Sequence, residues 1–318
     1  MKFSIGLAIA LAAATAALAL PAGARANGSD EQLLRTYEPT FVFDPVERFR
    51  PARVDEFVRD SVLERFDGST WQIVDSNPSH NTLPTSGGGF RLDQQDCSPA
   101  SVVGGLDCYT AAVAEHGRPS TVYGQVLRSD AAIVLEYWSF YYDDVYSYFY
   151  PPSNVIWQSH EGDWESIAIV LSPEGVPLEA GYSQHCRGQR RAWAATPRVD
   201  DTHPVVYVAV GSHAAYFTPG LHQLEPACIP PAAIGLLIQH GLPLPVDYAG
   251  VGEADTPLLE RINDGDGWAA FPGFWGELQY FHGPGAIGTV PFGTSPQGPA
   301  YHSAWSDPLG TLASWPVG

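Results

Sequence analysis

A short polar motif in the middle of the chain carries the strongest chemical signal. It runs from His160 to Glu165 as HEGDWE, and an apolar, β-branched stretch that predicts a strand follows it. Gly162 permits a tight turn into that strand, and alternation of side chains then places Asp163 and Glu165 on one face. With His160 folded back across the turn, one imidazole and two carboxylates would converge. Carboxylates this close repel each other unless a cation or a proton lies between them.

The preceding stretch adds two more acids. Asp143 and Asp144 end an aromatic strand, YWSFYYDD, that we expect to pair with the strand of the motif. Either acid would complete a site of carboxylate oxygens around one imidazole. Oxygen-rich sites of this kind suit hard divalent ions, so the pattern favours Mg or Ca over Mn or Zn as the cofactor. The alternative is a strand entrance whose acids face water or pair with arginine.

Four segments between residues 137 and 217, together with an N-terminal pattern that includes Tyr37-Glu38-Pro39, Glu47-Arg48-Phe49-Arg50-Pro51 and Val54, carry a family resemblance. YWSFYYDD, HEGDWESIAIVL, YSQH and HPVVYVAVGSHAAYF together resemble the vacuolar protein sorting-associated protein 62 family. A weaker resemblance, through the spacing H-x-x-D-W-E alone, is to the necrosis- and ethylene-inducing peptide-like cytolysins, whose hallmark is G-H-R-H-D-W-E. It implies a β-sandwich with a divalent ion on His160, Asp163, Glu165 and an acid at 143 or 144, and binding to sphingolipid headgroups at plant membranes. Ser159 and Glu161-Gly162 depart from that hallmark.

The N-terminus predicts export. Met1-Lys2 is followed by an alanine-rich apolar stretch, and Ala24-Arg25-Ala26 provides an A-x-A cleavage pattern. We therefore expect residues 1–26 to be a signal peptide and residues 27–318 to form a single β-rich domain. The mature protein would be secreted, to the cell exterior or the periplasm. No later segment is long and apolar enough to span a membrane.

Composition favours a mainly β fold. The chain has 32 Gly, 28 Pro and 12% aromatic residues, which is typical of many short strands joined by tight turns. We expect a β-sandwich with a few short peripheral helices. The formal net charge of −19 excludes a general nucleic-acid binder, because phosphate contacts need a basic surface.

The four cysteines predict disulfide bonds. In an exported chain an even number indicates a disulfide framework, and the most local of the three possible pairings joins Cys97 to Cys108 and Cys186 to Cys228. The spacing within each pair is not C-x-x-C. A zinc or redox site on these residues is therefore not indicated.

Aromatic residues before the motif form one candidate ligand surface. Tyr148, Tyr150 and Trp157 lie in the predicted loop between the aromatic strand and the motif. Exposed rings beside a metal would make a platform for a glycan or a lipid headgroup. Simple burial is the alternative.

Arginines after the motif form a second candidate surface. Arg187, Arg190 and Arg191 fall within five residues of an otherwise acidic chain. They could grip a phosphate, sulfate or uronate group next to the metal. Ion pairs with nearby acids are the competing interpretation.

Two further histidines are candidate acid–base groups. His185 follows a strand predicted over 177–184, and His213 follows one predicted over 205–210. Either histidine could complete the metal shell or act as general acid or base. No G-x-S-x-G elbow surrounds Ser183 or Ser212, so a serine hydrolase is not indicated.

Three functional hypotheses follow from these residues. The first is an exported, toxin-like binding protein that uses a metal ion and the arginines to hold an acidic or phosphorylated glycan or glycolipid headgroup. The second is a metal-dependent hydrolase of a phosphoester or glycan, with His185 or His213 as its acid–base group. The third is a structural domain without a metal, in which the motif is a buttress.

The remaining elements are predicted from patterning and caps. A capping box at Ser29 opens a short helix that Pro39 stops. The other expectations are helices within 51–66, 231–240 and 256–262, a loop over 77–95, strands over 121–127 and 131–142, and irregular edge strands over 299–308.

Overall fold

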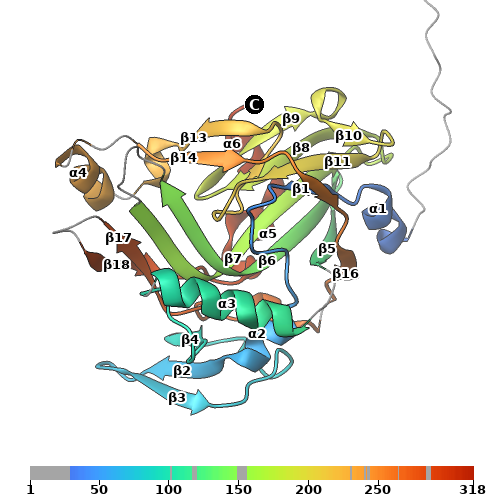
Figure 1. Ribbon diagram of the computed structural model, residues 1–318. Coiled ribbons are helices and arrows are strands. Elements are labelled where there is room, and N and C mark those ends of the chain that lie inside the picture. The colour runs from blue at the N-terminus through green and yellow to red at the C-terminus, as the bar shows by residue number, and fades with distance from the viewer. Residues whose placement is uncertain are drawn as a thin grey trace, which may run out of the picture.

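The computed structural model describes residues 29–100, 102–116, 120–148, 156–229, 231–239, 241, 244–263, 265–283 and 288–318. The fold is mainly β, with several packed sheets and a few short helices, as the sequence predicts (Figure 1). The predicted signal peptide and Tyr150 lie outside the described residues.

The largest sheet in the described part of the chain has eight strands. Six of them lie side by side in the order β16, β5, β6, β7, β17 and β18, and β8 and β9 lie off this path. The first part of β7 pairs with β17, whereas its last part pairs with β8, which in turn pairs with β9. The strands are β5 (Thr121–Arg128), β6 (Ile133–Tyr148), β7 (Ile156–Leu171), β8 (Pro177–Gln184), β9 (Arg187–Ala192), β16 (Leu258–Arg261), β17 (Leu278–His282) and β18 (Thr289–Thr294).

Strands β6 and β7 form the centre of the molecule. They pair antiparallel from Ile133↔Leu171 to Tyr148↔Ile156. Leu135 and its partner Ile169 face the main hydrophobic core, whereas Val134 and its partner Val170 face a second core that includes Leu312. Both faces of the pair are therefore covered there, which explains the unbroken apolar runs Ile133–Leu135 in β6 and Ile167–Leu171 in β7.

Three smaller sheets surround this centre. A five-stranded sheet contains β1 (Thr40–Phe43), β10 (Arg198–Val199), β11 (His203–Val208), β12 (Ala215–Tyr216) and β15 (Glu253–Asp255). A two-stranded ribbon contains β13 (Gly220–Gln223) and β14 (Val246–Ala249). A three-stranded sheet at the opposite end of the molecule contains β2 (Val62–Phe66), β3 (Trp71–Asp75) and β4 (Phe90–Asp93) (Figure 1).

The helices are short and peripheral. Ser29 caps the first of them by accepting a hydrogen bond from the backbone of Gln32, which confirms the predicted start. The α-helices are α1 (Asp30–Thr36), α2 (Val54–Asp60), α3 (Val102–His116), α4 (Pro231–Gln239), α5 (Ser303–Ser306) and α6 (Pro308–Ser314). Single 3₁₀ turns are η1 (Trp193–Ala195), η2 (Pro226–Cys228), η3 (Gly267–Ala270) and η4 (Pro299–Tyr301).

Several predicted elements are wrong in type or extent. The segment 256–262 contains strand β16 rather than a helix, because it pairs in parallel with β5. The helix predicted within 51–66 ends at Asp60, and β2 follows it. The predicted loop over 77–95 contains β4, a partner of β2. The segment 299–308 is helical rather than strand-like: Asp307 caps α6 by accepting from the backbone of Gly310, and Pro308 occupies the first turn.

Both predicted disulfides are confirmed. Cys97 is bonded to Cys108 of α3, and Cys186 is bonded to Cys228, which ties the turn between β8 and β9 to η2. No helix among the described residues is long and apolar enough to cross a bilayer.

Candidate metal centre

The motif lies inside a continuous strand rather than at a turn. Gly162 has a left-handed φ of 60° in the middle of β7, so the predicted tight turn is absent. His160 and Asp163 are three residues apart, and a regular strand would place them on opposite faces. Here their cross-strand partners are Asp144 and Tyr141, also three residues apart. The irregularity at Gly162 brings His160 and Asp163 to the same face.

Only glycine fits at this irregular position. A β-carbon built on Gly162 would lie 2.1 Å from the carbonyl oxygen of Trp275. A side chain would therefore clash with fixed backbone, in addition to the strain of a left-handed φ.

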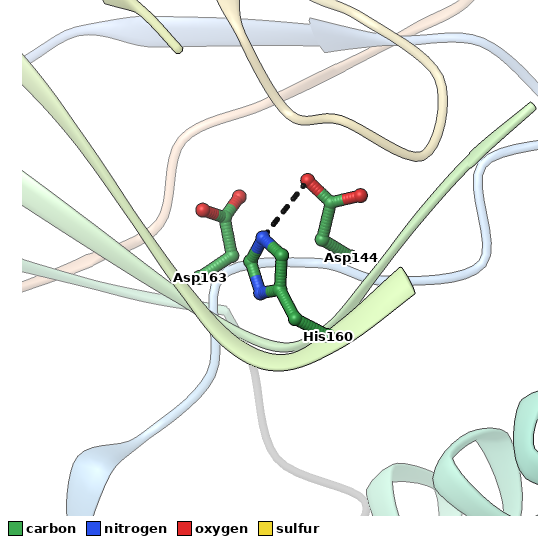
Figure 2. Close-up of side chains that lie close together, drawn as sticks. All are labelled: Asp144, His160 and Asp163. Carbon is green, nitrogen blue, oxygen red and sulfur yellow. Dashed lines mark ion pairs between the residues drawn. The ribbon is translucent and has the colours of Figure 1, made fainter. Parts of the chain in front are cut away.

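Asp144, His160 and Asp163 form a group that could hold a metal ion (Figure 2). Each offers one ligand atom, and the three atoms lie within 4.8 Å of one another. His160 Nε2 lies 3.5 Å from Asp144 Oδ2, while Nδ1–H donates to the carbonyl of Gly162 at 2.8 Å. In the neutral imidazole, the proton on Nδ1 leaves the lone pair of Nε2 on the side of the two carboxylates, which is the tautomer a metal ligand requires.

The electrostatics of this group fit a cation. All three residues are buried, and Asp144 Oδ1 has no hydrogen-bond partner within the described residues. Burial raises the pKa of Asp144, although His160 opposes the change. Burial lowers the pKa of His160, but the Asp144 carboxylate outweighs it and raises that pKa to about 9. Without a metal the group therefore retains a proton, which a divalent ion would displace.

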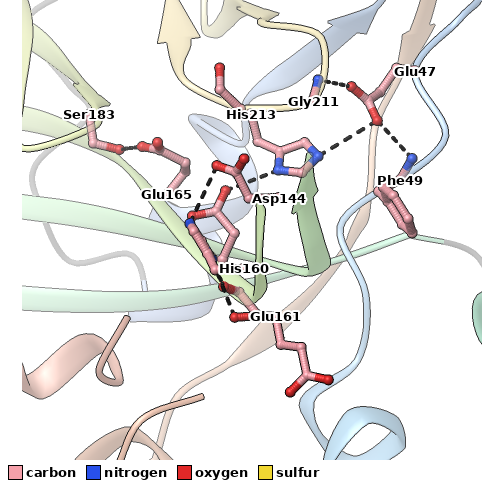
Figure 3. Close-up of polar contacts among 12 residues, drawn as sticks. Glu47, Phe49, Asp144, His160, Glu161, Glu165, Ser183, Gly211 and His213 are labelled. Carbon is pink, nitrogen blue, oxygen red and sulfur yellow. Dashed lines mark hydrogen bonds and ion pairs between the residues drawn. The ribbon is translucent and has the colours of Figure 1, made fainter. Parts of the chain in front are cut away.

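Asp143 does not belong to this group. Its cross-strand partner is Glu161, and both point to the opposite face of the β6–β7 pair, as Figure 3 shows for Glu161. Glu161 accepts a hydrogen bond from the Tyr109 hydroxyl at 2.6 Å. Burial raises the pKa of both acids well above the usual range. Of the two acids predicted at 143 or 144, the structure brings Asp144 to the histidine.

Glu165 lies beside the group but not within it. Its Oε2 accepts a hydrogen bond from the Ser183 hydroxyl (Figure 3). Burial and the neighbouring Asp163 raise the pKa of Glu165 to about 8. Its role as a metal ligand stays a prediction.

His213 connects Asp163 of the group to Glu47. Its Nδ1 lies 3.0 Å from Asp163 Oδ2 and its Nε2 lies 3.6 Å from Glu47 Oε1 (Figure 3). The ring stacks on Tyr141 at a centroid distance of 3.8 Å, and its side chain has no exposed surface. Burial lowers the pKa of His213, but Glu47 and Asp163 raise it to about 10. A fully enclosed imidazole is poorly placed to meet a substrate.

Sequence reasoning missed Glu47. The side chain accepts hydrogen bonds from the backbone of Phe49 at 2.8 Å and of Gly211 at 2.7 Å. These contacts join the N-terminal segment to the loop that carries His213. Glu47 belongs to the N-terminal pattern of the family resemblance, but it is distant in sequence from the motif, and nothing in the local sequence indicates that it meets His213.

His185, which is partly exposed, forms a separate pair with the buried Asp247 of β14. Its Nε2 lies 2.7 Å from Asp247 Oδ2, and Asp247 also accepts from the hydroxyls of Ser212 and Tyr216. Burial opposes protonation of His185, but Asp247 raises its pKa to about 9. Asp247 lies in a short two-stranded ribbon, so local sequence did not reveal it.

The three predicted arginines have different surroundings. Arg190 pairs with Glu179 at 3.2 Å and donates to the carbonyl of Trp315, so it holds the C-terminus against β9. Arg191 donates to the carbonyl of Gly318 and lies over the ring of Phe217. Arg187 is half-exposed, and within the described part of the chain its partner is Glu225, in an ion pair of 3.7 Å.

The aromatic platform stays a prediction. Tyr148 is the last residue of β6 and Trp157 is the second residue of β7, so both lie on strands rather than in a loop. Their side chains, like Tyr150 as a whole, lie outside the described residues.

Comparisons with known proteins give distant structural similarity only. No protein-family model matches the chain, and no curated protein matches it, so the resemblance to the vacuolar protein sorting-associated protein 62 family stays a prediction. Necrosis and Ethylene inducing Protein 2, from the causal agent of cocoa's witches' broom disease, is 14% identical, with 78% of this chain and 79% of that chain covered and a TM-score of 0.37. NLPPya in complex with mannosamine is 12% identical over 76% and 75% of the two chains, with a TM-score of 0.35. NLPPya in complex with glucosamine is also 12% identical, with 77% of this chain and 78% of that chain covered and a TM-score of 0.35.

Proposed function

We propose that this protein is an exported binding protein that holds one divalent cation on Asp144, His160 and Asp163. The observation that carries the proposal is the orientation of His160: its Nδ1–H is committed to the Gly162 carbonyl, so Nε2 is directed at two carboxylates. Two carboxylates with one imidazole favour Mg or Ca over Mn or Zn. Glu165, whose carboxylate interacts with that of Asp163, would complete the shell.

We further propose that the ion helps to bind an acidic or phosphorylated glycan or glycolipid headgroup. The chain carries a net charge of −19, so an acidic ligand would be repelled unless local cations offset that charge. A bound divalent ion and Arg187 would supply them. Export rests on the predicted signal peptide, and the two disulfides are compatible with an oxidising compartment.

Metal analysis of the purified protein tests the first part. We expect one equivalent of Mg or Ca in the wild type and loss of the metal in His160→Ala and Asp163→Ala. His80→Ala, which removes an imidazole from the loop before β4, should keep the full content. Circular dichroism would confirm that each variant is folded. Absence of bound metal after incubation with excess Mg, Ca, Mn or Zn would leave the group as a structural network.

Ligand titration tests the second part. Glucose 6-phosphate and galacturonate would be compared with the amino sugars glucosamine and mannosamine, each with and without EDTA. We expect the acidic sugars to bind more tightly and to lose affinity when the metal is removed. Equal binding of acidic and amino sugars would contradict the proposed ligand class.

A metal-dependent hydrolase is the second candidate, and the His185–Asp247 pair favours it. A buried carboxylate that fixes one nitrogen of a partly exposed histidine is a common arrangement around a general acid or base. In that case the bound ion would act as a Lewis acid, and His185 would donate a proton to the leaving group. Metal-dependent turnover of a phosphoester or glycan that His185→Gln abolishes would favour this function over binding alone.

A further inference from the structure

A polar cavity lies beside the turn between β8 and β9. Its volume is about 130 Å³, and neither the carboxylates nor the imidazole of the metal group line it. Three stretches of the chain meet there: the β8–β9 turn, strand β13 and η2. The side chains that line it are mostly polar and include Gln184, His185, Arg187, Gln189, His222 and Glu225.

His185 is held rigidly at the wall of this cavity. One ring nitrogen is fixed by Asp247, which is itself fixed by two hydroxyl groups. The other ring nitrogen makes no hydrogen bond within the described residues, and the side chain is 21% exposed. His185 also has a left-handed φ of 54°, and the Cys186–Cys228 disulfide follows it directly. The imidazole is therefore held in place at the wall of the cavity by Asp247 and by edge-on packing against Tyr146, and its other nitrogen is not used by Asp247.

Arg187 lies in the same wall and is free to exchange its partner. Its ion pair with Glu225 spans 3.7 Å, and both side chains are nearly half exposed. Exposed ion pairs of this kind contribute little to the stability of the fold, because water competes for both charges. Arg190 and Arg191, in contrast, are occupied by Glu179 and by carbonyls near the C-terminus.

We propose that this cavity binds a small oxyanion group, a phosphate, sulfate or carboxylate, between the open nitrogen of His185 and the guanidinium of Arg187. Asp247 holds His185 in its protonated form at neutral pH, so both groups donate hydrogen bonds as cations. The neutral amides of Gln184 and Gln189 complete a polar lining.

This inference deepens the proposed function, because it assigns the acidic part of the ligand to a defined cavity. It does not need the metal: the cavity and the metal group share no residue. A test on EDTA-treated protein can therefore succeed or fail independently of the metal site.

Inorganic phosphate is the first probe, with the ring resonances of His185 and calorimetry as readouts on EDTA-treated protein. We expect saturable binding that shifts the His185 resonances. Arg187→Gln should weaken it by about tenfold or more, the effect of losing a charge-assisted hydrogen bond. Arg191→Gln is the matched control, since it removes a nearby arginine that does not line the cavity, and should change affinity by less than about twofold.

His185→Gln provides a second variant with a similar volume, and thermal melting would show whether it folds. Titrations with sulfate and glucuronate then distinguish two sources of the anionic group. Sulfate represents a sulfate or phosphate ester, and glucuronate represents a uronic acid. Millimolar phosphate without any shift at His185, or equal losses in Arg187→Gln and Arg191→Gln, would overturn the proposal. Phosphate binding that requires added Mg or Ca would place the anion at the metal instead and would also overturn it.

Discussion

At the scale of single residues, the candidate metal centre depends on one glycine. His160 and Asp163 share a face only because Gly162 adopts a left-handed φ within β7. The backbone at that point also packs against the Trp275 carbonyl. The same residue therefore sets the geometry of the ligands and the approach of the C-terminal part of the chain.

Gly162→Ala should disrupt both the geometry of the metal ligands and the packing of β7 against Trp275. We expect a loss of more than about 3 kcal/mol in the free energy of unfolding, from left-handed strain and from the clash with Trp275. Metal affinity should fall as well, because relief of the clash would rotate the strand. Chemical denaturation and metal analysis would measure the two effects.

Gly288→Ala is the matched control for that experiment. Gly288 has a nearly identical φ of 59°, but a built β-carbon there meets no atom within 4 Å. The free energy of unfolding of Gly288→Ala should fall by only about 1–2 kcal/mol, the cost of a left-handed φ for alanine. Equal losses in the two variants would contradict the role assigned to the Trp275 contact.

At the scale of elements, the β8–β9 turn is held in place by a covalent bond. Cys186 joins the turn to η2, and the residues on either side of it, His185 and Arg187, form the wall of the anion cavity. The other disulfide joins Cys97 to α3, and neither of its cysteines lines the cavity or belongs to the metal group. The two bonds therefore differ in their expected effect on function as well as on stability.

Removing the two disulfides separately tests this difference. Replacement of Cys186 and Cys228 by serine should cost about 4 kcal/mol, and replacement of Cys97 and Cys108 about 3 kcal/mol, since the first pair closes 42 residues and the second closes 11. Phosphate affinity should fall only in the first variant. Chemical denaturation and phosphate titration measure these effects, and loss of phosphate binding in both variants would indicate general unfolding instead.

At the scale of the whole molecule, the fold buries many ionisable groups. Glu136 is buried between Gln125 and Trp138, and burial raises its pKa from 4.5 to about 7. The His185 pKa is raised from 6.5 to about 9 by Asp247, against the effect of burial. In both cases the folded chain keeps a proton that the unfolded chain releases at lower pH.

The sign of this linkage predicts a protein that is less stable in alkali. Between pH 4.5 and 7 Glu136 binds more protons in the folded state than in the unfolded state, and between pH 6.5 and 9 the same holds for His185. The free energy of unfolding of EDTA-treated protein should therefore fall from pH 5 to pH 9. Each group alone contributes about 3 kcal/mol.

Denaturation at a series of pH values measures this trend. Glu136→Gln should reduce the slope of the lower half of the profile, and His185→Gln should reduce the slope of the upper half. Part of the slope remains in each variant, because the pKa values of Glu165, His160 and His213 are raised as well. A wild-type stability that rises between pH 5 and pH 9 would contradict the assignment of these buried protons.

Local sequence was sufficient for the features that depend on neighbouring residues. Alternation and turn residues predicted a mainly β fold, Ser29 predicted the start of α1, and the cysteine spacing predicted both disulfides. His160 and Asp163 were found as candidates because their chemistry is unusual beside a strong strand signal. Each of these signals acts over a few residues, or through a covalent bond with few possible pairings.

Tertiary structure alone decided which residues meet. The register of β6 against β7 selected Asp144 over Asp143, and the segment 299–308 became helical at a position where patterning suggested edge strands. Glu47 and Asp247 complete the two buried networks from distant segments, and no local pattern could identify them. The physical reason is that strand register and long-range packing are set by the sum of many contacts across the sheet, whereas propensity and capping are properties of single turns and strands.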